Sequence, residues 1–184
     1  MGTFRITGGK KLSGIIKPQG AKNEALQVLC SVLLTDDVVR INNIPDILDV
    51  QKLIIILKEL GVKVKRHDSN SYSFKADEIN LKYLHTNKFK DNIGSLLGAI
   101  MIVGQLLARY GKVYIPKPGV DKIGRRRLDT HFQGFIKLGA KFRYNEEESF
   151  YGVESDKLIG TSMLLDEASV TGTANIVMAA VLAK

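Results

Sequence analysis

The sequence predicts an α/β fold of the inverted (inside-out) barrel type, in which buried helices lie at the centre and sheets lie outside. Apolar residues go nearly all round three predicted helices, at residues 22–34, 95–109 and 173–183, and this pattern is typical of helices buried on every side. The run Leu60-Gly61-Val62-Lys63-Val64 recurs as Leu138-Gly139-Ala140-Lys141-Phe142. Its period of roughly 75 residues is too long for a solenoid repeat and fits a βαβαββ unit.

The first predicted unit opens with the buried helix at 22–34, which is followed by a short strand at 38–41. An amphipathic helix at 49–60 then ends at Gly61, a common helix C-terminal stop. Residues 62–65 and 72–75 predict a hairpin. Ahead of this unit, residues 4–17 predict two short strands separated by glycines.

The second unit repeats this order of elements. Its predicted elements are the helix 95–109, a strand at 113–115, a loop at 118–127, a helix at 129–138 and a hairpin of 141–144 with 150–153. A third unit begins with the helix 173–183. We therefore expect residues 1–20 to be strands that pack on a second domain, and residues 21–184 to be an incomplete barrel domain with repeats at about 22–92, 93–170 and 171–184. On this interpretation the chain is the N-terminal portion of a longer protein.

Composition restricts the classes of binding partner but does not identify one partner. The formal charge of +8, from 27 basic and 19 acidic residues, favours anionic partners. Three adjacent arginines without an aromatic stacking platform are a weak nucleic-acid signal, so no nucleic acid is expected. The longest apolar run, 93–108, is short and interrupted by polar residues and glycines, and no signal peptide is evident, so no membrane is expected. The single cysteine, Cys30, lies in an apolar run and predicts a core thiol in a reducing, cytoplasmic setting.

The segment 118–131 combines a loop, a helix start and a cluster of cations. Pro118 and Gly119 open the loop, Arg125 to Arg127 follow, and a helix begins near Asp129. A loop that enters a helix favours anions, and arginine matches phosphate and carboxylate geometry. Asp121 is a candidate proton donor beside such an anion. The alternative is a solvated basic turn with an ordinary salt bridge.

Four motifs are distributed over nearly the whole chain. One is the run Pro118-Gly119-x-Asp121-x-Ile123-Gly124-x-Arg126-x-x-Asp129-x-His131. The others are Gly20-Ala21-Lys22-Asn23, Ile44-Pro45-Asp46-Ile47-x-Asp49-Val50 and Asp166-x-x-Ser169-Val170-Thr171-Gly172-Thr173-x-Asn175. Together, in order and in spacing, they resemble one enzyme family, the UDP-N-acetylglucosamine 1-carboxyvinyltransferases of the EPSP synthase-like superfamily, and the first run is similar to that family's active-site loop.

The resemblance implies a reaction without metal or organic cofactor. The enolpyruvyl group of phosphoenolpyruvate passes to the 3′-hydroxyl of UDP-N-acetylglucosamine, and phosphate is released, in the first committed step of peptidoglycan biosynthesis. An acid protonates the vinyl CH₂, the sugar hydroxyl attacks the resulting cationic carbon, and phosphate leaves. The resemblance also implies a second, C-terminal domain, absent from this sequence, which supplies further phosphate-binding arginines and a carboxylate base.

The resemblance assigns roles to residues one by one. Asp121 is the general acid, at a position where most members carry cysteine; a carboxylate there predicts fosfomycin resistance. Lys22 and Arg126 hold phosphoenolpyruvate, and Asn23 hydrogen-bonds the sugar. The pocket for the uridine and diphosphate is lined by Arg126, Arg127, Leu128, Asp129, Thr130 and His131, with Ser169, Val170 and Thr171.

Plainer interpretations stay open for some of these residues. Asn23 fits a helix N-cap, Arg125 and Arg127 fit a solvated turn, and His131 fits a satisfied surface histidine on an amphipathic helix. Three departures from the family pattern also matter. Leu97 stands where the family has an active-site arginine, Val120 replaces a loop glycine and Glu167 replaces a common lysine.

These departures and the length of the chain leave a second hypothesis, in which the protein is a catalytically inactive fragment or paralogue that binds a UDP-sugar. A third candidate is the sister enzyme that uses shikimate 3-phosphate. The 118–131 loop argues against it, because its resemblance is to the UDP-sugar enzymes.

Overall fold

The computed structural model of the chain describes residues 3–94, 96–116, 128–145 and 150–184. Its helices are α1 (Lys22–Ser31), η1 (Val32–Leu34), α2 (Leu48–Glu59), η2 (Leu81–His85), α3 (Asn87–Gly94), η3 (Leu97–Ile102), α4 (Val103–Tyr110), α5 (Asp129–Lys137) and α6 (Val170–Ala180), where η marks a 3₁₀ helix. Its strands are β1 (Val38–Ile41), β2 (Lys63–Arg66), β3 (Tyr72–Lys75), β4 (Lys112–Pro116), β5 (Lys141–Asn145) and β6 (Phe150–Glu154).

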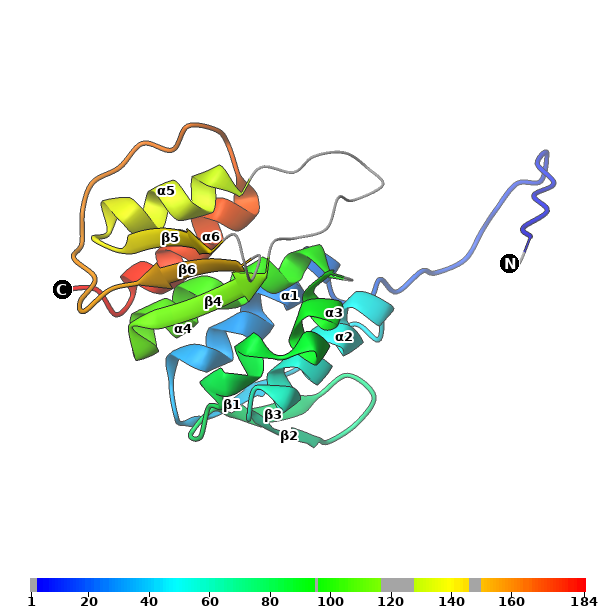
Figure 1. The fold of residues 1–184 in the computed structure, drawn as a ribbon. Helices are drawn as coiled ribbons and strands as arrows, with labels where there is room; N and C mark the ends of the chain where they lie inside the picture. Colours follow the sequence, from blue (N-terminus) through cyan, green and yellow to red (C-terminus); the bar gives the residue numbers. More distant parts are fainter. Residues whose placement is uncertain (1–2, 95, 117–127, 146–149) are drawn as a thin grey trace.

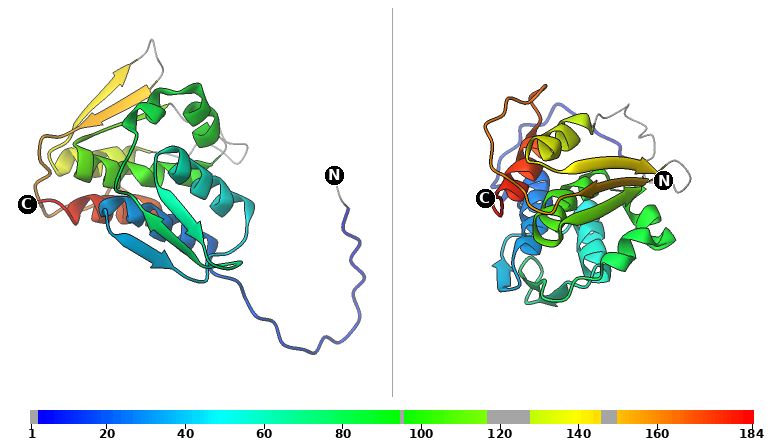
Figure 2. Two further views of the ribbon diagram at one scale, coloured as in Figure 1. Left: turned by 90° about the horizontal axis from the view of Figure 1, so that it is seen from below. Right: turned by 60° about the vertical axis from the view of Figure 1, so that its left-hand side comes forward.

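The strands form two antiparallel three-stranded sheets with the same topology, β1-β3-β2 and β4-β6-β5. In each sheet the last strand of the hairpin lies in the middle and pairs with both neighbours. Phe74 of β3 faces Val39 and Val64, and Val153 of β6 faces Val113 and Phe142. The two sheets lie as separate layers outside the helices (Figures 1 and 2). The expected inside-out α/β architecture is therefore confirmed.

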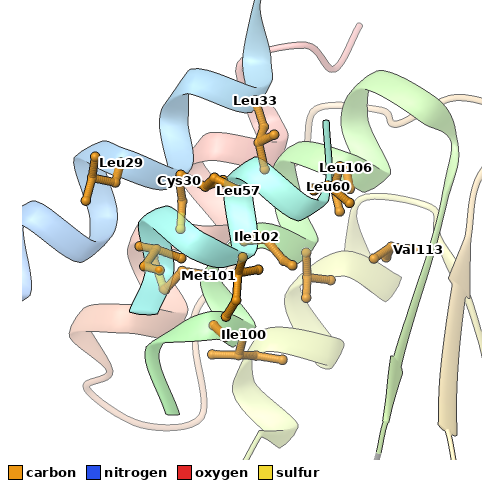
Figure 3. Close-up of a cluster of buried hydrophobic side chains, with 14 of the residues drawn as sticks. Leu29, Cys30, Leu33, Leu57, Leu60, Ile100, Met101, Ile102, Leu106 and Val113 are labelled. Carbon is orange, nitrogen blue, oxygen red and sulfur yellow. The ribbon is translucent and has the colours of Figure 1, made fainter. Parts of the chain in front are cut away.

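The hydrophobic core lies among the inner helices and the strands that follow them (Figure 3). Leu29 and Leu33 from the first unit and Ile102 and Leu106 from the second belong to this cluster, and all four are fully buried. Each such burial stabilises the fold by about 1.5–3 kcal/mol. Cys30 lies in the same cluster with no exposed surface, and burial raises the pKa of its thiol far above the usual value. The predicted core thiol is confirmed.

The two Leu-Gly repeats end their helices in the same way. After α2, Gly61 adopts φ +107° and its N–H bonds Lys58 O, while the next N–H bonds Leu57 O. After α5, Gly139 adopts φ +94° and repeats both hydrogen bonds one unit later. A left-handed residue at this position lets the chain turn back into the hairpin, and glycine adopts it without a Cβ penalty.

The structure differs from the sequence-based expectation at the N-terminus and in the second inner helix. Residues 3–19 are exposed and form no strand, because a strand needs a hydrogen-bonded neighbour and no described segment pairs with them. The helix expected at 95–109 is instead η3 followed by α4, with η2 and α3 before it.

The inner helices are also less enclosed than their composition suggested. On α6, Val170 and Val177 are 74% and 56% exposed, and the C-cap residue Val181 is 62% exposed; on α1, Val28 is 38% exposed. Within the described ranges, no single helix is long and apolar enough to cross a bilayer. One bent pair, Asn87–Ile93 with Gly98–Tyr110, satisfies that test only when its two parts are combined.

Candidate functional site

Lys22 and Asn23 occupy the first turn of α1. Lys22 is the first helical residue, and its Nζ forms an ion pair with Asp49 in the first turn of α2. The Lys22 side chain remains 52% exposed, so it is available to an anion while Asp49 orients it. The helix N-cap is Ala21, which makes no side-chain cap bond. The alternative that Asn23 is the N-cap is therefore wrong.

The first turn of α5 contains residues that were predicted to bind the nucleotide, and these residues differ in their exposure to solvent. Leu128 is the N-cap residue, and Asp129 is exposed in the first turn, where a helix dipole favours a negative charge. Thr130 is buried, and its Oγ1 lies 2.9 Å from Asp166 Oδ1 and 3.1 Å from Glu167 Oε1. Because one hydroxyl donates a single hydrogen, it serves one carboxylate at a time.

His131, in the same turn, is only 3% exposed, so its interpretation as a surface histidine is wrong. Its Nδ1 lies 3.1 Å from Asn175 Nδ2, a group that can only donate, so Nδ1 accepts and the ring is neutral. Burial lowers the pKa of His131 to about 4, although the nearby Glu167 charge opposes that shift. His131 thus holds a neighbouring helix rather than presenting a charge at the surface.

The first turn of α6 contains the other predicted nucleotide-side residues. Ser169 is the N-cap, and its Oγ accepts a hydrogen bond of 3.1 Å from Gly172 N–H. This cap starts the helix at Val170, three residues before the predicted start. Val170 and Thr171 are exposed. A Cβ built on Gly172 would lie 3.0 Å from Thr130 Cγ2, so the first turns of α5 and α6 are in contact.

Three helices begin at the same end of the molecule. In Figure 1, α1, α5 and α6 each begin at their right-hand end, so their first turns face the same end of the molecule. Leu26, one turn after Lys22, packs on Gly98 of η3, which links α1 to the second unit. Helix N-termini carry partial positive charge and free N–H groups, so a set of them with Lys22 favours anionic ligands such as phosphates.

Several predicted residues cannot be placed. Asp121, Arg126 and Arg127, together with Val120 and Arg125, lie outside the described residues. Within the part of the chain that is described, no group of His, Cys, Asp and Glu side chains could hold a metal ion.

Two residues were present in the quoted motifs but received no role from the sequence. Asp49 pairs with Lys22, and Asn175 bonds His131 and the η3–α4 backbone. A polar residue inside the otherwise apolar run 173–183 was the available signal for Asn175.

Comparison with known proteins decides the family. The profile of the family described as EPSP synthase (3-phosphoshikimate 1-carboxyvinyltransferase) matches residues 6–184. The chain belongs to the EPSP synthase family. Solved structures share this fold. The enolpyruvyl transferase NikO from Streptomyces tendae matches with a TM-score of 0.62 and 19% sequence identity, and the match covers 82% of this chain and 32% of that one. An EPSP synthase from Acinetobacter baumannii has a TM-score of 0.65 at 12% identity, over 93% and 38%. At these identities the likeness shows the fold alone.

Relatives within the EPSP synthase family have a more specific name. Proteins named UDP-N-acetylglucosamine 1-carboxyvinyltransferase are 59% identical in Bacteroides fragilis over 184 residues, 52% in Porphyromonas gingivalis over 183, and 41% in Borreliella burgdorferi over 184. Each match covers 100% of this chain and 42% of the relative. The chain therefore spans less than half the length of these relatives.

Proposed function

We propose that this chain is the nucleotide-sugar part of a UDP-N-acetylglucosamine enolpyruvyl transferase. The reaction moves the enolpyruvyl group of phosphoenolpyruvate to the sugar 3′-hydroxyl and releases phosphate, the first committed step of peptidoglycan biosynthesis. The observation that carries the proposal is that α1, α5 and α6 begin at one end of the molecule, where the motif residues at the starts of α5 and α6 are in contact and Lys22 pairs with Asp49. The names of relatives at 59% and 52% identity support this substrate pair.

Each substrate would meet a different part of this end. Lys22 would contact the phosphate or carboxylate of phosphoenolpyruvate, with Asp49 fixing its direction. Asn23 would bind the sugar. The uridine and diphosphate would lie along the first turns of α5 and α6, where the exposed Thr171 offers a hydroxyl and the first backbone N–H groups of each helix have no acceptor within the helix.

The proton transfer is assigned to Asp121. Its carboxylic acid would protonate the vinyl CH₂, and the 3′-oxygen would attack the cationic carbon while its proton passes to the carboxylate base of the second domain. In the elimination step the new methyl group would lose a proton, the C=C bond would re-form, and the C–O bond to phosphate would break. Arg126 would hold phosphoenolpyruvate and Arg127 would face the nucleotide. No metal or organic cofactor enters this scheme, and the reaction would take place in the cytoplasm, which suits the unpaired Cys30.

Catalysis would also need a second domain that closes over the substrates. The length of the relatives supports this, because the chain covers 42% of them. A carboxylate is a poorer nucleophile than a thiolate, so Asp121 would confer fosfomycin resistance.

A second candidate is a catalytically inactive protein that binds a UDP-sugar. Leu97 stands where the resemblance places an active-site arginine, so this position supplies no cation to phosphoenolpyruvate. The Glu167 carboxylate, 3.1 Å from Thr130 Oγ1, would repel a diphosphate and lower the affinity for the nucleotide in either candidate.

Ligand titration tests the proposal. Addition of UDP-N-acetylglucosamine to the ¹⁵N-labelled chain should shift the amides of Asn23, Thr130 and Ser169 to Thr171, whereas shikimate 3-phosphate should not. Lys22→Ala should abolish the phosphoenolpyruvate-induced shifts in α1, while Lys58→Ala, a control on the exposed face of α2, should retain them. Equal shifts with shikimate 3-phosphate would contradict the proposed substrate.

A further inference from the structure

The side chain of Asn175 replaces a helical hydrogen bond in another helix. At the junction of η3 and α4, the N–H of Gly104 would bond Ile100 O in a continuous α-helix. Instead it donates to Asn175 Oδ1 at 2.9 Å, and Asn175 Nδ2 donates to Ile100 O at 2.9 Å. Ile100 O also accepts the N–H of Val103, the i to i+3 bond of a 3₁₀ helix. The carboxamide thus stands between the two groups that would otherwise pair.

The environment holds Asn175 in this orientation. Its side chain is fully buried, and its second Nδ2 hydrogen points to Nδ1 of the neutral His131. Both N–H hydrogens of the Asn175 carboxamide therefore have an acceptor, and its oxygen accepts one hydrogen bond. Glycine at 104 is required for the approach, since a Cβ there would lie 2.3 Å from Asn175 O and 2.6 Å from Oδ1.

The choice between 3₁₀ and α geometry moves the start of η3. A 3₁₀ helix rises about 2.0 Å per residue and an α-helix about 1.5 Å, so six residues differ by roughly 3 Å in length. The turn per residue differs by about 20°, which rotates residue 97 by roughly 120° relative to α4. Gly98, beside it, packs against Leu26 one turn after Lys22. The junction therefore sets where η3 meets the first unit.

We propose that Asn175 is a positioning residue, whose carboxamide holds η3 in 3₁₀ geometry and so couples the first turns of α5 and α6 to the turn of α1 that contains Lys22. The junction is a two-state element. When Asn175 is engaged, Gly104 N–H is occupied and η3 is 3₁₀; when Asn175 is withdrawn, Gly104 N–H can bond Ile100 O and η3 can become α-helical. A ligand that shifts α6 biases this equilibrium, which is the physical requirement for coupling. The ligand arm of this proposal rests on the proposed function, while the conformational arm does not.

The conformational arm is tested without ligand. In the wild-type chain, scalar coupling across the hydrogen bond should connect Gly104 ¹⁵N with Asn175 ¹³Cγ; a coupling to the Ile100 carbonyl instead would overturn the proposal. In Asn175→Leu, which keeps the number of side-chain heavy atoms and the branch at Cγ, the backbone chemical shifts of residues 97–103 should change to α-helical values and the nuclear Overhauser contact between Gly98 and Leu26 should be lost. Retention of both in Asn175→Leu would also overturn it. Val177→Ala, on the exposed side of α6, is the matched control and should change neither.

The ligand arm compares the same variants. UDP-N-acetylglucosamine should shift the Gly98 and Lys22 amides in the wild type and in Val177→Ala. In Asn175→Leu those two shifts should be lost, while the shifts of Ser169 to Thr171 persist. Full retention at Gly98 in Asn175→Leu contradicts the coupling. Absence of any shift in the wild type would reject the proposed function instead, and the ligand-free measurements would still decide the role of Asn175.

Discussion

Gly104 and Asn175 are in direct contact across the α4–α6 interface, with the Gly104 N–H 2.9 Å from Asn175 Oδ1. Helices α4 and α6 can approach this closely because position 104 has no side chain. An added Cβ would lie 2.3 Å from a backbone oxygen of α6, which a rotamer change cannot relieve. Helices α5 and α6 also pack closely at a glycine, since a Cβ at Gly134 would lie 2.2 Å from Ile176 Cδ1.

Gly104→Ala should therefore destabilise the chain. Alanine favours a helix by about 1 kcal/mol over glycine, but overpacking against backbone costs about 1–3 kcal/mol and the lost Asn175 bonds add to it. We expect a net loss of roughly 2 kcal/mol in the free energy of unfolding, measured by urea denaturation. Gly152→Ala is the control, because its Cβ would make only ordinary contacts of 3.5 Å with Tyr114. Equal stability of Gly104→Ala and wild type would show that α4 and α6 do not pack this closely.

His131 should make stability depend on pH between about 4 and 6.5. Its folded pKa of about 4 lies below the unfolded value near 6.5, so in this window the unfolded chain binds the extra proton. Stability therefore falls as the pH falls through the window, by at most about 3 kcal/mol. His131→Gln should flatten the dependence, whereas His67→Gln, at an exposed histidine, should not. An unchanged pH profile in His131→Gln would contradict the buried, neutral assignment.

The two glycines that end α2 and α5 should differ in their tolerance of alanine. Both have positive φ, which costs a residue with a Cβ about 1–2 kcal/mol. At Gly61 the Cβ would also lie 2.3 Å from Glu78 O, whereas at Gly139 its nearest neighbour is Lys157 O at 3.8 Å. Gly61→Ala should lower the urea midpoint clearly more than Gly139→Ala. The reverse order would mean that the turn after α2 is not packed as described.

Gln105→Leu should stabilise the chain. Gln105 is fully buried in α4, and within the described residues its Oε1 has no hydrogen-bond partner, while its Nε2 meets only the sulfur of Met178. Replacing an unsatisfied polar group with an apolar one of similar size should gain about 1–2 kcal/mol in the free energy of unfolding. Gln133→Leu, at an exposed position on α5, should change stability little. Destabilisation by Gln105→Leu would indicate a partner for Oε1.

Much of the fold could be predicted from the sequence because its signals are local. Alternating strands, the Leu-Gly helix ends and the buried apolar runs each depend on neighbouring residues, and the structure forms those elements close to their predicted positions. The break between η3 and α4 could not be predicted, because its cause, Asn175, is more than 70 residues away in the sequence. The burial of His131 has the same origin, since α6 covers it.

The candidate site was predictable only as a set of residue types. Composition and spacing indicated an anion site in the 118–131 segment, and the resemblance added Lys22, Asn23 and Ser169 to Thr171. The pairing of Lys22 with Asp49 depends on the relative placement of two helices, which local sequence does not encode.

The central claim is tested most directly by turnover in a chimera. Residues 1–184 would replace the matching 42% of the Bacteroides fragilis relative, which is 59% identical over that length, so that the rest of the relative supplies the second domain. Mass spectrometry should detect enolpyruvyl-UDP-N-acetylglucosamine with equimolar phosphate, Asp121→Asn should abolish it, and shikimate 3-phosphate should give no product. A chimera that binds UDP-N-acetylglucosamine without forming product, or that keeps its full rate in Asp121→Asn, would contradict the account.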